Sequence, residues 1–162
     1  MLILNELKAE DLGGALKIWN DVVKDGIAFP QDKEMTVDEA ISFFNAQTKT
    51  IAAKDTKDDQ VVGVYILHPN NVGRCAHICN ASYAVPKDYR GRGIGELLVK
   101  DCIKRAKECG FKILQFNAVV ADNIPALNLY EKLGFKQLGI IPKGFKNIDG
   151  TYKDIIPHYI EL

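Results

Sequence analysis

The sequence has no excess of charge of either sign. Lys plus Arg and Asp plus Glu each total 21, so the formal net charge of the 162 residues is zero. Proteins that bind nucleic acid or anionic membranes usually carry a basic surface, so we expect neither as the main partner. A neutral chain agrees better with a small-molecule substrate than with a histone tail.

Long apolar runs are also lacking. No stretch approaches the roughly 20 apolar residues of a membrane-spanning helix. The first eleven residues are a short apolar run interrupted by Asn5 and Glu6, which is typical of neither a signal peptide nor a transit peptide. We therefore expect a cytoplasmic protein that does not associate with a membrane.

Cysteine is scarce, and its spacing fits none of the common cysteine-based sites. The four cysteines, Cys75, Cys79, Cys102 and Cys109, form no Cys-x-x-Cys pair, and they have too few partners for a zinc site. We expect reduced thiols and no bound metal. Cys102 falls on an apolar helical stripe, where burial is favoured over a catalytic role.

Internal repeats, low-complexity segments and linkers are absent, so residues 1–162 are expected to form a single domain. The hydrophobic fraction of 47% and the charged fraction of 26% are ordinary for a globular protein with a sizeable core. Hydrophobic periodicity predicts the element order β-α-α-β-β-β-α-β-α-β-β. The expected strands span residues 2–7, 50–54, 61–67, 75–85 and 112–120, with two more in 135–162, and the expected helices begin near residues 12, 37, 94 and 124.

This element order predicts an α/β (α+β) fold, in which antiparallel strands precede a right-handed crossover. The sheet is expected to be mixed, mostly antiparallel and of about seven strands, with helices on both faces. Three local signals mark element ends: Asp11 as a helix cap, Thr36 with Glu39 as a capping box, and Asp149-Gly150 as a hairpin turn.

The stretch Arg90-Gly91-Arg92-Gly93-Ile94-Gly95 lies directly before an amphipathic helix. No Ser, Thr, Asp or Asn caps the start of this helix, so its free N–H groups and its dipole favour an anion there. Arg90 and Arg92 add positive charge. We therefore expect a ligand phosphate at this helix start, and a plain strand-to-helix turn is the alternative. The apolar stripe of the helix is Ile94, Leu98, Cys102 and Ala106.

Two segments together resemble a known family. Residues 85–95 resemble the acetyl-CoA motif of the GCN5-related N-acetyltransferase (GNAT) superfamily, Gln/Arg-x-x-Gly-x-Gly/Ala, through Arg90, Gly93 and Gly95. A second match, from Val119 to Phe135, follows in the family's order and at its usual separation. The resemblance implies the GNAT fold, splayed between the fourth and fifth strands, with acetyl-CoA as acetyl donor. It also makes a homodimer the expected assembly.

The resemblance implies a place for each part of the cofactor. Backbone N–H groups of residues 90–95 would hold the pyrophosphate, and the pantetheine arm would lie in the gap between the splayed strands. The N–H of Val85 would bind the thioester carbonyl, where negative charge develops. The implied cofactor-binding residues are Val85, Arg90, Gly91, Arg92, Gly93, Ile94, Gly95, Val119 and Asn123.

Two residues are candidates for proton transfer. Tyr130 matches the family position of the general acid, and a phenol with a pKa of ~10 suits protonation of a thiolate; packing on an apolar helical face is the alternative. Many relatives carry a Glu base on the strand before the glycine loop, but residues 74–83 contain no carboxylate. His77, expected on this strand facing the same way as Tyr83, is the candidate base, with a core histidine as the alternative.

Three residues are candidates for contact with the acceptor. Asn80 and Asn117 lie on the two strands that flank the splay, where they would orient substrate or water. Phe29 lies where the family's variable substrate loop is found, between the first two helices.

The C-terminal segment resembles the corresponding hairpin of phosphinothricin-type acetyltransferases, which acetylate the α-amine of small amino-acid-like compounds. The resembling residues are 141–146 and 149–154. We therefore expect acetyl transfer from acetyl-CoA to the primary amine of such a molecule, by direct attack in a ternary complex. The alternatives are a protein N-terminal or lysyl acetyltransferase and a non-catalytic acyl-CoA-binding module.

Overall fold

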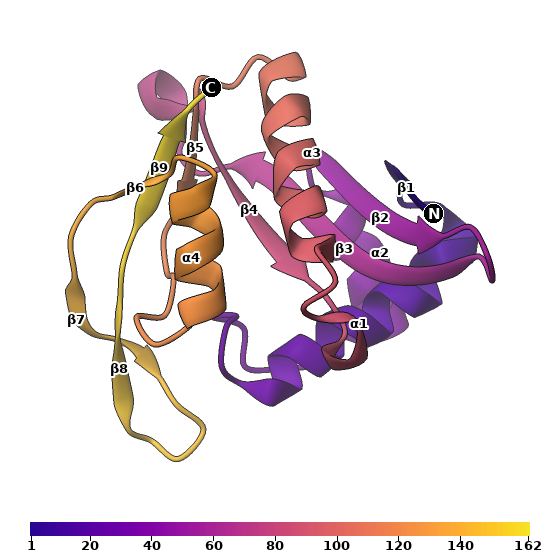
Figure 1. Cartoon of the computed structure of the whole chain (residues 1–162), viewed down its shortest axis with the longest axis horizontal. Coiled ribbons are helices and arrows are strands. Elements are labelled where there is room, and N and C mark those ends of the chain that lie inside the picture. Colours follow the sequence, from indigo (N-terminus) through magenta and orange to yellow (C-terminus); the bar gives the residue numbers. More distant parts are fainter.

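The computed structural model describes all 162 residues and contains a seven-stranded sheet with a separate two-stranded hairpin (Figure 1). The strand order in the large sheet is β1-β2-β3-β4-β5-β9-β6, and β7 pairs with β8. The strands are β1 (Leu2–Glu6), β2 (Lys49–Asp55), β3 (Gln60–Pro69), β4 (Ile78–Ala84), β5 (Ile113–Phe116), β6 (Lys136–Gln137), β7 (Ile141–Lys146), β8 (Tyr152–Ile155) and β9 (His158–Glu161). The α-helices are α1 (Leu12–Asp25), α2 (Val37–Asn45), α3 (Ile94–Glu108) and α4 (Ile124–Lys132).

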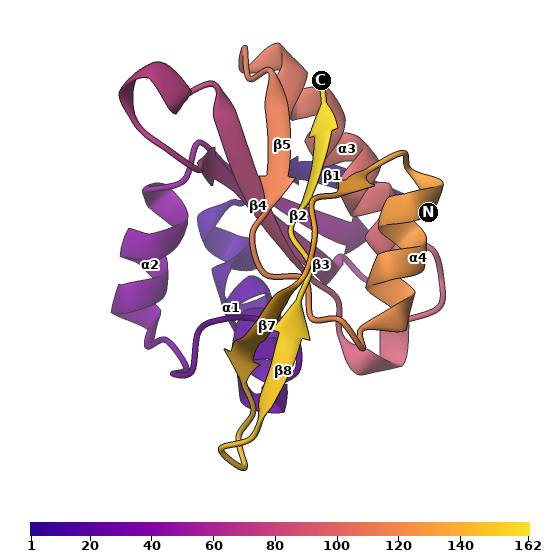
Figure 2. The ribbon, with the colours of Figure 1, turned by 90° about the vertical axis from the view of Figure 1, so that its left-hand side faces the viewer.

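Helices cover both faces of the large sheet, as predicted. The helices α1 and α2 pack on one face, and α3 and α4 lie on the other (Figures 1 and 2). Every pairing in the sheet is antiparallel except that of β4 with β5. The predicted mixed, mostly antiparallel α/β fold is therefore confirmed. No helix has both the length and the apolar composition needed to cross a lipid bilayer.

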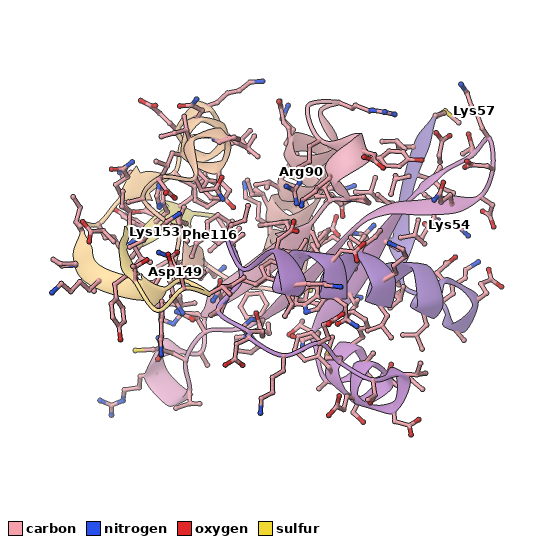
Figure 3. The ribbon with its side chains drawn as sticks, turned by 90° about the horizontal axis from the view of Figure 1, so that it is seen from below. Lys54, Lys57, Arg90, Phe116, Asp149 and Lys153 are labelled. Carbon is pink, nitrogen blue, oxygen red and sulfur yellow. The ribbon has the colours of Figure 1, made fainter.

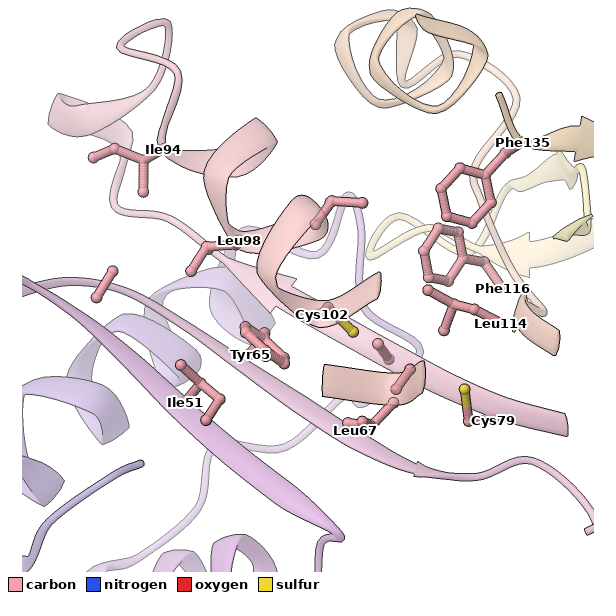
Figure 4. Close-up of a cluster of buried hydrophobic side chains, with 14 of the residues drawn as sticks. Ile51, Tyr65, Leu67, Cys79, Ile94, Leu98, Cys102, Leu114, Phe116 and Phe135 are labelled. Atoms are coloured by element: carbon pink, nitrogen blue, oxygen red, sulfur yellow. The ribbon is translucent and has the colours of Figure 1, made fainter. Parts of the chain in front are cut away.

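The core beneath α3 rests on the predicted apolar stripe. Ile94, Leu98 and Cys102 (Figure 4) are buried against β3, β4 and β5. Ala106 is buried in the same cluster. The facing strand β3 carries Gly63, where an added Cβ would come within 3.1 Å of a Leu98 methyl group. The small residue therefore lets α3 lie close to the sheet, which fixes where the helix begins.

The predicted splay between β4 and β5 is present. These parallel strands pair only at Ile78 with Ile113 and at Cys79 with Leu114. Beyond these pairs, β4 continues along β3 as far as Ala84, while β5 continues along β9. The two strands therefore diverge toward the end at which the glycine loop follows β4.

Two predicted strands are too long. Residues 73–75 form a 3₁₀ turn that Gly73 begins at a positive φ of 57°, so β4 starts at Ile78 rather than at Cys75. The strand predicted for residues 112–120 ends at Phe116, where its pairing with β9 stops. Residues 119–121 then pair with residues 154–156 instead.

The C-terminal segment contains four short strands where two were predicted. Gly139, at a φ of 132°, lies between β6 and β7, and Pro157, which has no N–H to continue a ladder, lies between β8 and β9. The predicted Asp149-Gly150 turn is confirmed, since the Thr151 N–H donates to Asp149 Oδ1 at 2.9 Å and Gly150 has a φ of 84°.

The two predicted helix caps have different outcomes. Thr36 and Glu39 form the complete capping box at the start of α2. Asp11 does not cap α1, because its carboxylate forms a buried ion pair with Lys54 on β2, at 2.7 Å. The charge of Lys54 thus holds the Asp11 side chain against the sheet.

Candidate active site

The glycine loop offers a row of free backbone donors. Gly91 and Gly93 have positive φ angles of 75° and 78°, and no atom lies within 4 Å of an added Cβ at either position. Backbone conformation, not lack of space, therefore requires glycine there. The N–H groups of residues 91–96 donate to no group of the chain, and no side chain caps α3. Free donors at a helix start are suited to bind phosphate.

Two of the cations beside this loop, Lys87 and Arg90, are held by one carboxylate. Asp25, the last residue of α1, forms ion pairs with Lys87 at 2.8 Å and with Arg90 at 3.6 Å. The Arg90 Nε donates to the carbonyl of Val85 at 3.3 Å. The Arg92 guanidinium lies 4.9 Å from the centre of the Tyr89 ring. Arg90 therefore links the glycine loop to the end of β4.

A cavity of about 390 Å³ lies at the splay. No charged residue and no histidine lines it, and two thirds of its lining residues are hydrophobic. It brings together residues from the loop after α1, from β4, from the segment between β5 and α4, and from α4: Phe29, Asn80, Asn117, Val119, Asn123 and Tyr130. Asn117 thus lies just after β5 and not on the strand as predicted.

A second cavity, of about 440 Å³, joins the splay to the glycine loop. It shares Ala28, Tyr83 and Asn123 with the first cavity, and it reaches Val85, Arg90 and Gly95. Arg90 and Lys153 line this second cavity, and Phe116 lines the first. Figure 3 labels these three side chains. The two cavities form a path from the free N–H groups of the loop to Tyr130. This path suits an extended ligand with phosphates at one end.

The N–H of Val85 also donates to no group of the chain. Val85 follows the last residue of β4, at the second cavity, so a ligand that lies between the splayed strands can accept this hydrogen bond. At the other side of the cleft, Asn123 caps α4, with Oδ1 accepting from the N–H of Ala126 at 3.4 Å. A pantetheine arm with a pyrophosphate fits these free donors.

Tyr130 is held by aromatic packing. Its ring lies 4.6 Å from Phe116, 5.4 Å from Phe135 and 5.6 Å from His158, measured between ring centres. Burial raises the pKa of the Tyr130 phenol above its ordinary value. The phenol is therefore protonated at neutral pH, at the wall of the first cavity.

The placement predicted for His77 is wrong. His77 lies in the exposed turn before β4, because the 3₁₀ turn at Gly73 shortens the strand. Its backbone carbonyl accepts from the N–H groups of Lys112 and Ile113, and its ring lines neither cavity. The structure therefore does not bring His77 to Tyr130 or to the splay.

The histidine that does lie beside Tyr130 is His158. It is only 1% exposed, and its Nδ1 lies 2.6 Å from the carbonyl of Ile156. Burial lowers the pKa of His158 although this hydrogen bond opposes the shift, and the Nε2 atom has no partner. No local motif marks this residue in the sequence, since its contact with α4 depends on the pairing of β9 with β5.

Comparisons with known proteins agree with this geometry. The profile of the acetyltransferase (GNAT) family matches residues 16–135. The N-acetyltransferase aca1 of Schizosaccharomyces pombe is 34% identical over 137 residues, which cover 75% of this chain but only 66% of that protein. A GCN5-related N-acetyltransferase from Kribbella flavida is 32% identical and superposes with a TM-score of 0.91, covering 99% of this chain and 98% of that one.

A phosphinothricin acetyltransferase of Sinorhizobium meliloti, solved in complex with acetyl-CoA, also has this fold. Its TM-score is 0.91 at 20% identity, covering 99% of this chain and 88% of that one. The family match spans most of the chain and includes both the glycine loop and Tyr130. The chain thus belongs to the GNAT family of acetyltransferases and resembles the phosphinothricin-type members of that family.

Proposed function

We propose that this enzyme transfers the acetyl group of acetyl-CoA to the primary amine of a small, amino-acid-like molecule, by direct attack in a ternary complex. The observation that carries the proposal is the uncharged cavity at the splay, about 390 Å³ in volume, which the second cavity connects to the glycine loop. Phe29, Pro30 and Tyr130 all line it. Donor and acceptor would meet there.

The backbone positions the donor. The N–H groups of residues 91–96 would bind the pyrophosphate, and the N–H of Val85 would bind the thioester carbonyl. This last hydrogen bond strengthens as negative charge develops on the carbonyl oxygen, so it lowers the barrier to attack. Because Arg90 contacts the Val85 carbonyl, the phosphate-binding loop and the carbonyl-binding N–H are kept in a fixed relation.

Tyr130 would supply the proton that the leaving sulfur needs, and the proton that the amine nitrogen loses as the amide forms would restore the phenol through water. Burial raises the pKa of the phenol, so the side chain carries its proton at neutral pH. Transfer of that proton to the sulfur avoids release of a free thiolate into an apolar cavity. The aromatic contacts with Phe116 and Phe135 restrict the ring and so restrict the direction of the O–H group.

The cavity itself would select the deprotonated amine. It contains no carboxylate to stabilise an ammonium ion and no histidine to accept its proton. Burial in such surroundings disfavours the charged form and lowers the pKa of the bound amine. The amine therefore loses its proton to solvent before or during binding, and no side chain that lines this cavity acts as general base.

An amine panel tests the proposed function. Free-thiol release from acetyl-CoA is measured with amino acids, amino-acid amides, short peptides with free N-termini, and lysine-containing peptides with blocked N-termini. We expect release with small amino-acid-like amines and little with the blocked peptides. Release with peptides alone would favour a protein acetyltransferase. Binding of acetyl-CoA without thiol release for any amine would favour a non-catalytic module.

A further inference from the structure

Three amide side chains form a network beside the splay. Asn117 Nδ2 donates to Asn70 Oδ1 at 2.7 Å, and Asn70 Nδ2 donates back to Asn117 Oδ1 at 3.2 Å. Gln115 Nε2 donates to the same Asn117 Oδ1 at 3.1 Å. Asn70 follows the end of β3, and Gln115 and Asn117 lie on and just after β5. The network thus joins two segments on either side of β4.

These side chains lie on the sheet face that carries α1 and α2. Along β5, the side chains of Leu114 and Phe116 pack into the core under α3, so Gln115 and Asn117 point to the other face. Asn117 lines the 390 Å³ cavity, whereas Asn70 and Gln115 do not. Asn70 and Gln115 therefore lie behind Asn117 as seen from the cavity.

The network leaves one hydrogen-bonding group of the Asn117 side chain free. Its Oδ1 accepts two hydrogen bonds, and one of its two Nδ2 hydrogens is used by Asn70. An amide oxygen has two lone pairs and an amide nitrogen has two hydrogens. The remaining group is a single N–H donor. Without Asn70, the amide of Asn117 could rotate and present its oxygen to the cavity instead.

We propose that Asn70 is a positioning residue, which together with Gln115 holds Asn117 with an N–H facing the acceptor. This inference rests on the proposed function for the location of the acceptor. The group that pairs with Asn117 is a hydrogen-bond acceptor, namely a carboxylate or carbonyl oxygen next to the reactive amine. No charged residue lines the cavity, so such a neutral donor would supply the selectivity for amino-acid-like molecules over simple amines.

A role in stability alone would not explain the network. Asn117 is exposed, and Asn70 and Gln115 are only half-buried. β3 is already joined to β4 by six paired positions, and β5 to β9 by four. Loss of the Asn70 side chain therefore leaves the sheet intact, and Asn70→Ala should fold with nearly unchanged thermal stability.

Steady-state kinetics test the proposal with Asn70→Ala and with Asn71→Ala as the matched control, since Asn71 is exposed and its side chain makes no hydrogen bond. We expect Asn70→Ala to raise the KM for an amino-acid amide roughly five- to tenfold, as loss of one oriented hydrogen bond would, with the KM for acetyl-CoA unchanged. The double variant with Asn117→Ala should be no worse than Asn117→Ala alone. The KM for a simple alkylamine, which lacks the carbonyl, should change with neither Asn70→Ala nor Asn117→Ala.

A second readout is independent of turnover. In ¹⁵N-labelled protein, the side-chain amide signals of Asn117, identified by their absence from Asn117→Ala, should shift in Asn70→Ala and stay in place in Asn71→Ala. Unshifted signals in Asn70→Ala, or equal KM values of Asn70→Ala and Asn71→Ala for the amino-acid amide, would overturn the proposal. If the wild type acetylates peptides but no amino acid, the proposed substrate class fails, and the same comparison with a peptide acceptor still tests Asn70.

Discussion

At the scale of single residues, Tyr130 shows how packing and chemistry combine in one side chain. The alternatives from the sequence were a general acid and a packing residue, and the structure shows aromatic packing around a phenol at the cavity wall. These two roles are compatible, because the packing holds the ring while the residue lines the cavity. The two roles predict different effects on kcat when the phenol oxygen is removed.

Tyr130→Phe should lower kcat by about 10²–10⁴-fold where chemistry limits the rate, since positioned proton transfer contributes that much. The dissociation constant for acetyl-CoA should stay unchanged, because the ring and its contacts remain. Tyr152→Phe, at an exposed site on β8, is the control and should keep full activity. If Tyr130→Phe also keeps full turnover in single-turnover experiments, Tyr130 only packs.

His158 should make stability depend on pH. Burial lowers its pKa in the folded state below 6.5, the ordinary value, so the unfolded chain takes up a proton at a higher pH than the folded chain does. The free energy of unfolding should therefore fall as pH drops from about 7.5 to about 5.5. His158→Leu should reduce this fall, and His77→Leu, at an exposed site, should keep it. Urea titrations at both pH values measure the effect, and identical slopes in wild type and His158→Leu would contradict it.

At the scale of elements, the glycine loop and α3 were predictable because their signals are local. The apolar stripe of α3, the capping box at Thr36 and the turn at Asp149-Gly150 each depend on residues a few positions apart. The start of β4 was predicted wrongly because the strand-like sequence pattern continues back into residues that form a 3₁₀ turn in the structure. The end of β5 was predicted wrongly because it depends on pairing with β9, far along the chain.

Gly93→Ala tests whether the loop conformation matters for the donor. The φ of 78° at Gly93 costs a residue with a Cβ roughly 1–2 kcal/mol, which the loop can relieve by changing shape. We expect the dissociation constant for acetyl-CoA to rise about tenfold, which corresponds to ~1.4 kcal/mol.

Gly13→Ala is the matched control for this loop variant. Gly13 lies in α1 with open space around it, so alanine should slightly stabilise the helix and leave acetyl-CoA binding unchanged. Equal affinities measured by calorimetry for Gly93→Ala and Gly13→Ala would show that the loop conformation is not needed.

At the scale of the whole molecule, the site depends on contacts that no local pattern contains. The cavity at the splay takes its walls from the loop after α1, from β4 and β5 and from α4. Asn80, Asn117 and Phe29 line one cavity, and the family resemblance places their elements around the splay; their contact with the acceptor stays a prediction. Asn70, Gln115 and His158 were not predicted as residues of the site, since their partners are distant in sequence and no local sequence motif marks them.

The central claim is that an uncharged cavity selects the neutral amine of the acceptor without a general base. It is tested most directly by the pH dependence of kcat/KM for two acceptors, an amino acid and its amide, whose amines differ in pKa. We expect each profile to rise with unit slope and to level at the pKa of that acceptor's own amine. Two profiles that level at one common pH, below both amine pKa values, would reveal a base on the enzyme and contradict the claim.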